Sequence, residues 1–230
     1  MRVAERRISR GEASGFSLLE VVVVLGLIGV LAALLCGQLR DQSGAALRSG
    51  QATLAGLVLL ARTQAQAAGR PARLLVQADA GAADRFLRCL AVQAQETAGW
   101  RTLAVARLPA EVRVVPGDFP DLPAGLMGTG ESADWRRADG SRLRSSALPA
   151  GQRVLVAVDT PDPEYWATCT FSPAGTTFQS GDLVLASARL RPPSAGSGDS
   201  PVVLGPPDTV RGLSLSAYGV PAPIDSREGF

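Results

Sequence analysis

The sequence predicts an α+β fold in which a long N-terminal α-helix precedes a β-rich globular head. Two observations lead to this expectation. An almost wholly apolar run covers residues 16–37, and an amphipathic pattern of helical period continues from it to Ala68. From Arg70 onward the pattern changes to short Val-, Leu- and Ala-rich segments separated by Gly- and Pro-containing turns, which is typical of strands.

The apolar run is the first element, and only Ser17 and Glu20 within it are polar. Its 22 residues would form a helix of roughly 33 Å, enough to cross a bilayer core of about 30 Å. Residues 1–15 hold four Arg and two Glu, whereas the remaining chain holds 19 Arg and 19 acidic residues and has no net charge. Because positive charge precedes the run, we expect a membrane-spanning first half of the helix, over about 16–37, with the N-terminus in the cytoplasm.

Two other targeting signals share part of this pattern. A secretory signal peptide also has a basic start, but its apolar region is usually shorter and ends in a small-residue cleavage site, which we do not find here. A lipoprotein signal would use Cys36, yet the residue before it, Leu35, is large where that signal needs a small one. Both alternatives are therefore less favoured than a membrane-spanning helix.

The second half of the helix is amphipathic. Its apolar positions recur at steps of seven, four, three, four and three residues, as one helical face requires: Leu47, Leu54, Val58, Ala61, Ala65 and Ala68. Gly44, Gly50 and Gly56 weaken the helix locally. Gly69, followed by Pro71, predicts its end. The domains expected are a leader (1–15), the long helix (16–69) and the head (70–230).

The head is expected to contain eight strands joined by loops. Segments 116–151 and 191–208 are rich in Gly, Pro and Ser and are interpreted as insertions, while the tail after Pro221 is expected to fray. A hairpin turn is expected at 97–100. The predicted strands cover residues 72–77, 85–95, 101–108, 111–115, 153–159, 169–171, 182–190 and 212–218.

Residue types that support catalysis or metal binding are scarce. The chain has no His, and its three Cys show no CxxC spacing. It also lacks a G-x-S-x-G motif and a phosphate-binding loop, so we expect neither an enzyme nor a cofactor. From Arg70 the head holds 16 Arg and 17 acids, which makes nucleic acid an unlikely partner. The three acids of 159–164 suit Ca²⁺ in type, although an exposed loop is the better interpretation.

The start of the apolar run resembles a known processing motif. The sequence Gly15-Phe16-Ser17-Leu18-Leu19-Glu20, preceded by a basic leader and followed by an apolar helix, is similar to the N-terminus of type IV pilins and type II secretion pseudopilins. The resemblance implies that prepilin peptidase cuts between Gly15 and Phe16. It also implies that Phe16 is then N-methylated and that Glu20 becomes the fifth mature residue.

Two further segments are similar to one branch of that family. Residues 59–76 and 169–186 resemble the GspH/FimT-like group of minor pilins and pseudopilins, which implies a head of two small antiparallel sheets packed on the helix. The implied function is a structural subunit of a type II secretion pseudopilus or a type IV pilus. The implied partners are other pilins through the N-terminal helix, prepilin peptidase, the inner-membrane assembly platform and membrane lipid. The implied location is the inner membrane, single-pass, with a periplasmic head.

Three questions stay open on the sequence alone. Glu20 either pairs with the α-ammonium of Phe16 in a neighbouring subunit, which the family motif favours, or reaches the lipid headgroups. Cys89 and Cys169 either form a disulfide in an oxidising compartment or remain two buried thiols. The alternative functions are a membrane-anchored binding module and a pilus-tip adhesin or DNA receptor.

Overall fold

The computed structural model describes residues 18–117, 123–127, 135–149, 151–191 and 199–230, without the side chains of 20 and 30–43. The chain divides into two compact units, Met1–Asp41 and Gln42–Phe230. The second unit contains the sheets and begins well before the predicted head boundary at Arg70. The last 27 residues of the helix, from Gln42 to Ala68, therefore belong to the head.

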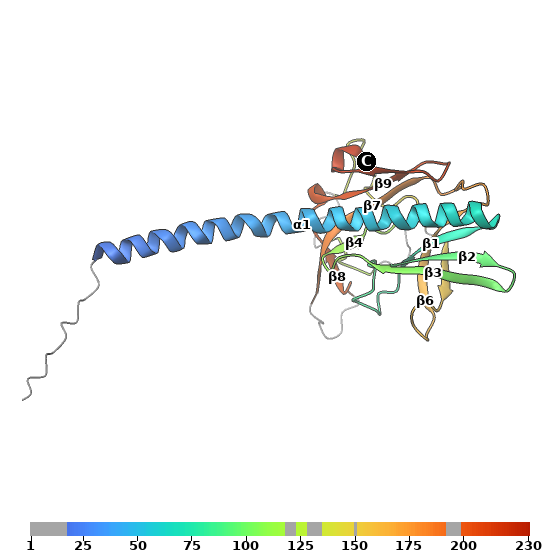
Figure 1. The fold of residues 1–230 in the computed structure, drawn as a ribbon, viewed down its shortest axis with the longest axis horizontal. Coiled ribbons are helices and arrows are strands. Elements are labelled where there is room, and N and C mark those ends of the chain that lie inside the picture. Colours follow the sequence, from blue (N-terminus) through green and yellow to red (C-terminus); the bar gives the residue numbers. More distant parts are fainter. Residues whose placement is uncertain (1–17, 118–122, 128–134, 150, 192–198) are drawn as a thin grey trace, which may run out of the picture. The chain divides into compact units, whose positions relative to one another are not determined.

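Figure 1 shows one α-helix followed by strands that form two sheets. The elements are α1 (Leu18–Ala68), β1 (Ala72–Gln77), β2 (Cys89–Glu96), β3 (Gly99–Arg107), β4 (Val112–Val114), β5 (Arg153–Val156), β6 (Glu164–Phe171), β7 (Gly181–Leu190), β8 (Val202–Leu204), β9 (Arg211–Leu215) and β10 (Pro221–Ile224), with two short 3₁₀ helices, η2 (Pro207–Thr209) and η3 (Arg227–Gly229).

Both sheets are antiparallel. The first has the strand order β3-β2-β1-β6-β5, and the second has the order β10-β9-β7-β4, with β8 added along β7. In Figure 1 the second half of α1 passes between β9 and the β2–β3 pair. The buried stripe of this half, which includes Leu54, Val58 and Ala61, joins residues from both sheets in one core.

The central strand of the first sheet explains why that sheet is covered on both faces. All six residues of β1 are buried. Leu74 and Val76 face the main core under α1, whereas Leu75 belongs to a smaller apolar cluster on the other face. Side chains alternate between the faces of a strand, so a fully buried strand requires cover on both sides.

The helix ends where the sequence predicts. Gly69 adopts a left-handed conformation, with φ of 61°, which costs glycine little because it has no Cβ. The N–H of Arg70 then donates to the carbonyl of Ala65 over 3.2 Å and closes the last turn. Pro71 follows and directs the chain into β1.

Two regions expected to be peripheral are part of the packed head. Within the predicted insertion 116–151, the side chains of Trp135, Leu143 and Leu148 are buried in the main core. The tail that was expected to fray after Pro221 forms β10, which pairs with β9. Prolines are tolerated in β10 because it is an edge strand, where missing N–H donors break no central ladder.

The predicted fold class and location need correction. Among the described residues, no helix is both long enough and apolar enough to cross a membrane. The expectation of a helix with a membrane-spanning first half is therefore wrong, and so is the single-pass inner-membrane location. All pairings between the strands of the described chain are antiparallel.

Candidate assembly surfaces

The first described turns of α1 expose apolar side chains. Leu18 is 83 % exposed, and the side chains that follow are exposed as well: Leu19, Val21, Val22, Val23, Val24, Leu25, Leu27 and Ile28. Successive residues of an α-helix are about 100° apart, so Val21–Leu25 alone cover its whole circumference. A helix that is apolar on all sides is normally buried, which makes this segment a candidate contact with other chains.

The residues of the predicted processing motif lie at or before this segment. Gly15 and Phe16 fall outside the described residues. Glu20 lies in the first turn of α1. The structure describes no side chain at Glu20, so its pairing with a neighbouring ammonium stays a prediction.

The two head cysteines are free thiols. They lie on strands that flank β1, but Cys169 faces the main core and Cys89 faces the smaller cluster with Leu75 and Trp166. A disulfide between them would have to pass through the sheet, so the open question is answered in favour of two buried thiols. Burial raises the pKa of both, that of Cys169 to about 12. Thiolate chemistry is therefore suppressed at both positions.

The acids of 159–164 do not converge on one point. Asp159 pairs with Arg107 over 3.6 Å, and Glu164 pairs with Arg85 over 3.0 Å. Across the described parts of the chain, no group of three or more potential ligands is arranged to hold a metal ion. Asp162 is exposed at the tip of this β5–β6 turn and makes no ion pair with any described residue.

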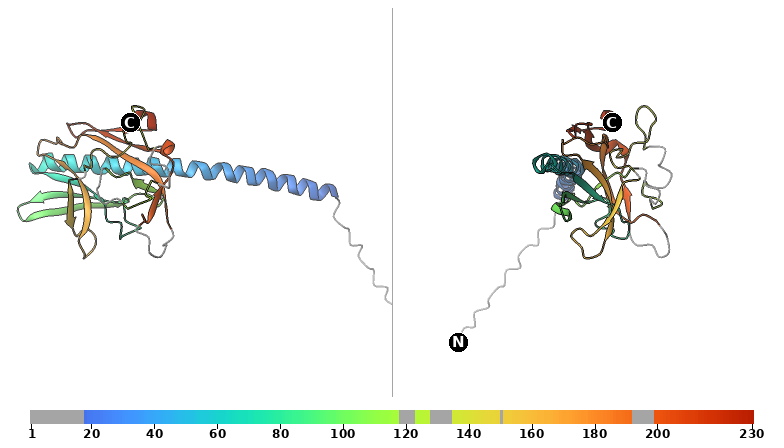
Figure 2. Two further views of the ribbon diagram at one scale, coloured as in Figure 1. Left: turned by 180° about the vertical axis from the view of Figure 1, so that it is seen from behind. Right: turned by 90° about the vertical axis from the view of Figure 1, so that its right-hand side faces the viewer.

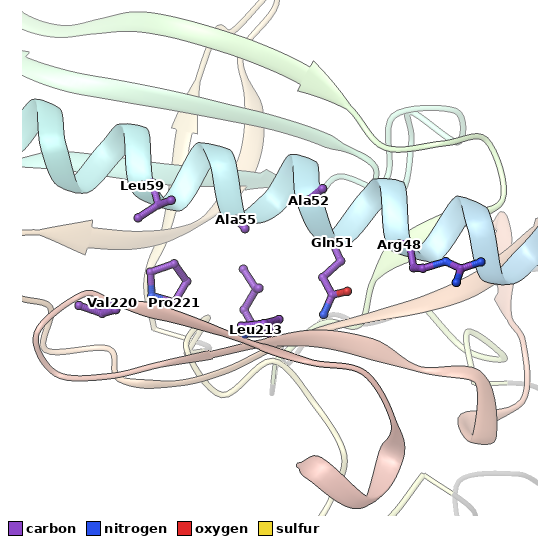
Figure 3. Close-up of a pocket in the computed structure, with 9 residues that line it drawn as sticks. Arg48, Gln51, Ala52, Ala55, Leu59, Leu213, Val220 and Pro221 are labelled. Carbon is purple, nitrogen blue, oxygen red and sulfur yellow. The ribbon is translucent and has the colours of Figure 1, made fainter.

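A groove of about 330 Å³ lies between α1 and the β9–β10 hairpin, as Figure 3 shows. Alanine and leucine side chains of the helix form one wall, and the hairpin forms the other. Its apolar lining includes Ala52, Ala55, Leu59, Leu213, Val220 and Pro221. Leu59 and Val220 remain partly exposed there, at 44 % and 47 % of their surface.

Two polar residues of α1 complete the groove. The side-chain amide of Gln51 donates to the carbonyl of Gly212 over 2.8 Å and to that of Ile224 over 2.9 Å, which ties the helix to β9 and β10. Arg48 lies at one end of the groove (Figure 3). It is exposed and has no ion pair with any described residue. The groove thus combines an apolar floor with one available positive charge.

No protein family, curated protein or solved structure matches the chain.

Sequence patterns did not reveal the groove. Its two walls come from residues 48–59 and 213–223, which are distant in the chain. One signal was available: Leu59 is apolar but lies off the buried stripe that Leu54, Val58 and Ala61 form. An apolar residue outside the core stripe of a helix indicates a second contact on another side of that helix.

Proposed function

We propose that this chain is a minor pilin or pseudopilin, a non-enzymatic subunit of a type IV pilus or a type II secretion pseudopilus. The observation that carries the proposal is the junction Gly15–Phe16 with Glu20 five residues into the mature chain, directly ahead of an apolar helix. The structure supports it with the exposed, all-round apolar surface of the first described turns of α1.

This surface suits assembly of many subunits side by side. Packing of apolar helices against each other removes their surface from water, at about 25 cal/mol for each Å² buried. Such burial is not directional and does not fix the axial step between neighbours. A charge pair between Glu20 of one subunit and the N-terminal ammonium of the next would fix it, since an unpaired charge among apolar helices is costly.

The proposal implies two kinds of partner. A prepilin peptidase removes residues 1–15 and thereby creates the ammonium at Phe16 on which the charge pair depends. Other pilin subunits then contact the apolar turns of α1. In this scheme the head, residues 42–230, stays outside the bundle of helices and carries the contacts that distinguish this subunit from others.

Intact-mass analysis of the chain from cells that express a prepilin peptidase tests this function. We expect a mature protein that begins at Phe16 and carries one additional methyl group. A Gly15→Val variant should remain uncut, while Gly11→Ala, which changes a leader glycine away from the junction, should be processed normally. A wild-type chain that retains Met1, or that begins near Cys36, would contradict the pilin assignment.

A further inference from the structure

The groove beside α1 has an apolar lining and a positive charge at one end only. Arg48 supplies a positive charge at one end, and no acidic residue is among the groove's lining residues. An occupant that fits must bring apolar atoms for the floor and a carboxylate for Arg48. It must also be narrow, because the groove holds only about 330 Å³.

The β5–β6 turn of the same chain has these properties. Its tip, Pro161-Asp162-Pro163, is fully on the surface, and Asp162 has no ion pair with any described residue. Proline on each side restricts the backbone, so less conformational entropy is lost when the tip is bound. The neighbouring acids Asp159 and Glu164 are already paired within the head, which leaves Asp162 as the available carboxylate.

The turn cannot enter the groove of its own chain. It follows β5, the outer strand of the first sheet, whereas the groove lies beside β10, the outer strand of the second. Figure 1 and Figure 2 place the gold β5–β6 turn on the side of the head away from the red β9–β10 hairpin. Two complementary surfaces on opposite sides of one subunit make a heterologous contact, which extends into an open assembly when the rotation between subunits does not close a ring.

We propose that the groove of one copy binds the β5–β6 turn of the next copy, with Asp162 placed against Arg48 and the flanking prolines against the apolar floor. This contact is a head-to-head interaction in the filament and rests on the proposed function. It supplies a second, charge-specified link between subunits, in addition to the contact between their N-terminal helices.

A disulfide cross-link between copies of the full-length chain, combined with charge-reversal variants, tests the contact. Ala55→Cys in one copy and Pro161→Cys in another, both in a Cys36→Ser background, should form a disulfide between copies under mild oxidation. Cys89 and Cys169 are buried free thiols and should not compete. Arg48→Glu alone and Asp162→Arg alone should each reduce the cross-linked fraction about tenfold, because each places like charges together. The double variant, and a mixture of the two single variants, should restore it.

A matched control is Arg70→Glu, which reverses an exposed charge just after the same helix. The Arg70 guanidinium donates to the Thr97 hydroxyl over 3.0 Å and not to the β9–β10 hairpin, so the cross-link should be unchanged. If both single variants cross-link like wild type, the contact is wrong. It is also wrong if Arg48→Glu abolishes the cross-link while the double variant fails to restore it, since the groove then binds something else. Methylation at Phe16 in the same preparation separates the two ideas: a processed chain without the head cross-link refutes this inference and leaves the proposed function standing.

Discussion

Cys169 shows how its surroundings decide the chemistry of a residue. Its thiol is fully buried in the main core, with the Thr177 hydroxyl 3.8 Å away, and burial raises its pKa from 9.0 to about 12. Cys89 is also buried but on the other face of the same sheet. The sequence offered these two residues as a possible pair, because two head strands contain one cysteine each. Which face each thiol occupies depends on strand register, which sequence spacing does not reveal.

The raised pKa of Cys169 predicts a pH dependence of stability. The folded protein holds the thiol proton more tightly than the unfolded chain, so this contribution is fully present below the unfolded pKa near 9.0 and is lost as pH rises toward about 12. Urea unfolding of wild type and of Cys169→Val at about pH 8 and about pH 10 should show a steeper loss of unfolding free energy for wild type. If the unfolding free energy falls equally with pH in both proteins, Cys169 is not the source of the pH dependence. Cys36→Ser serves as the control and should behave like wild type.

Glu20 carries the second prediction at this scale. Glu20→Val leaves the Gly15–Phe16 junction intact, so cleavage and methylation should persist. The N-terminal ammonium of a neighbouring subunit would lose its partner, at a cost of about 3–5 kcal/mol if the pair is buried. The processed variant should therefore be absent from sheared fibres, as cross-linking to other pilins would show. Ser17→Val, a nearby polar-to-apolar change, should still assemble. Normal incorporation of the Glu20 variant would remove the pairing role.

At the scale of elements, the sequence predicted structure well where the pattern is periodic and locally bounded. β1 occupies the predicted residues 72–77, and the end of α1 follows from Gly69 and Pro71. The sequence did not predict structure where contacts between distant residues determine it. β10 contains two prolines, and the sequence predicts a frayed tail there. Pairing with β9 nevertheless holds β10 in place, together with the hydrogen bond that the Gln51 side-chain amide donates to the Ile224 carbonyl.

The predicted insertion 116–151 failed for a related reason. Trp135, Leu143 and Leu148 are separated by polar residues with no regular period, so no amphipathic pattern marked them as core. The groove could not be predicted at all, because its walls meet only after folding. The apolar run of α1 gave the opposite kind of error, a feature predicted but not found. Its pattern predicts a membrane span that the described residues do not support.

The glycines of α1 give a prediction at the element scale. A Cβ at Gly50 would lie 3.1 Å from the Val112 side chain, whereas a Cβ at Gly56 would meet nothing within 4 Å. Gly56→Ala should therefore stabilise the head by about 0.5–1 kcal/mol, the difference in helix propensity. Gly50→Ala should gain less or lose stability, because α1 is tightly packed against β4 at this point. Thermal unfolding of the two variants tests this contrast, and equal stabilisation would show that α1 can shift away from β4.

At the scale of the whole molecule, the division after Asp41 is the main feature. The unit Gln42–Phe230 contains the second half of α1, both sheets and the main core. The exposed apolar side chains of the first described turns of α1, up to residue 29, lie in the first unit. The proposed contact between subunits through α1 and the folding of the head therefore depend on separate parts of the chain.

This separation predicts that a chain beginning at Gln42 is soluble and folds cooperatively. It retains the buried stripe of α1 and removes the exposed apolar turns. A single sharp thermal transition together with dispersed NMR signals would meet the expectation. A chain beginning at Arg70, which lacks the helix, should expose the core and aggregate. If the chain from Gln42 also aggregates under several buffers, the boundary is wrong.

The hydrogen bonds of Gln51 also set the order in which contacts form during synthesis. Gln51 lies in the helix, whereas the carbonyls that its side-chain amide binds belong to Gly212 and Ile224, 161 and 173 residues later in the chain. The cover that β9 and β10 provide for this part of the helix therefore cannot form until those residues have left the ribosome. Until then the nascent chain presents an uncovered helix face to its surroundings.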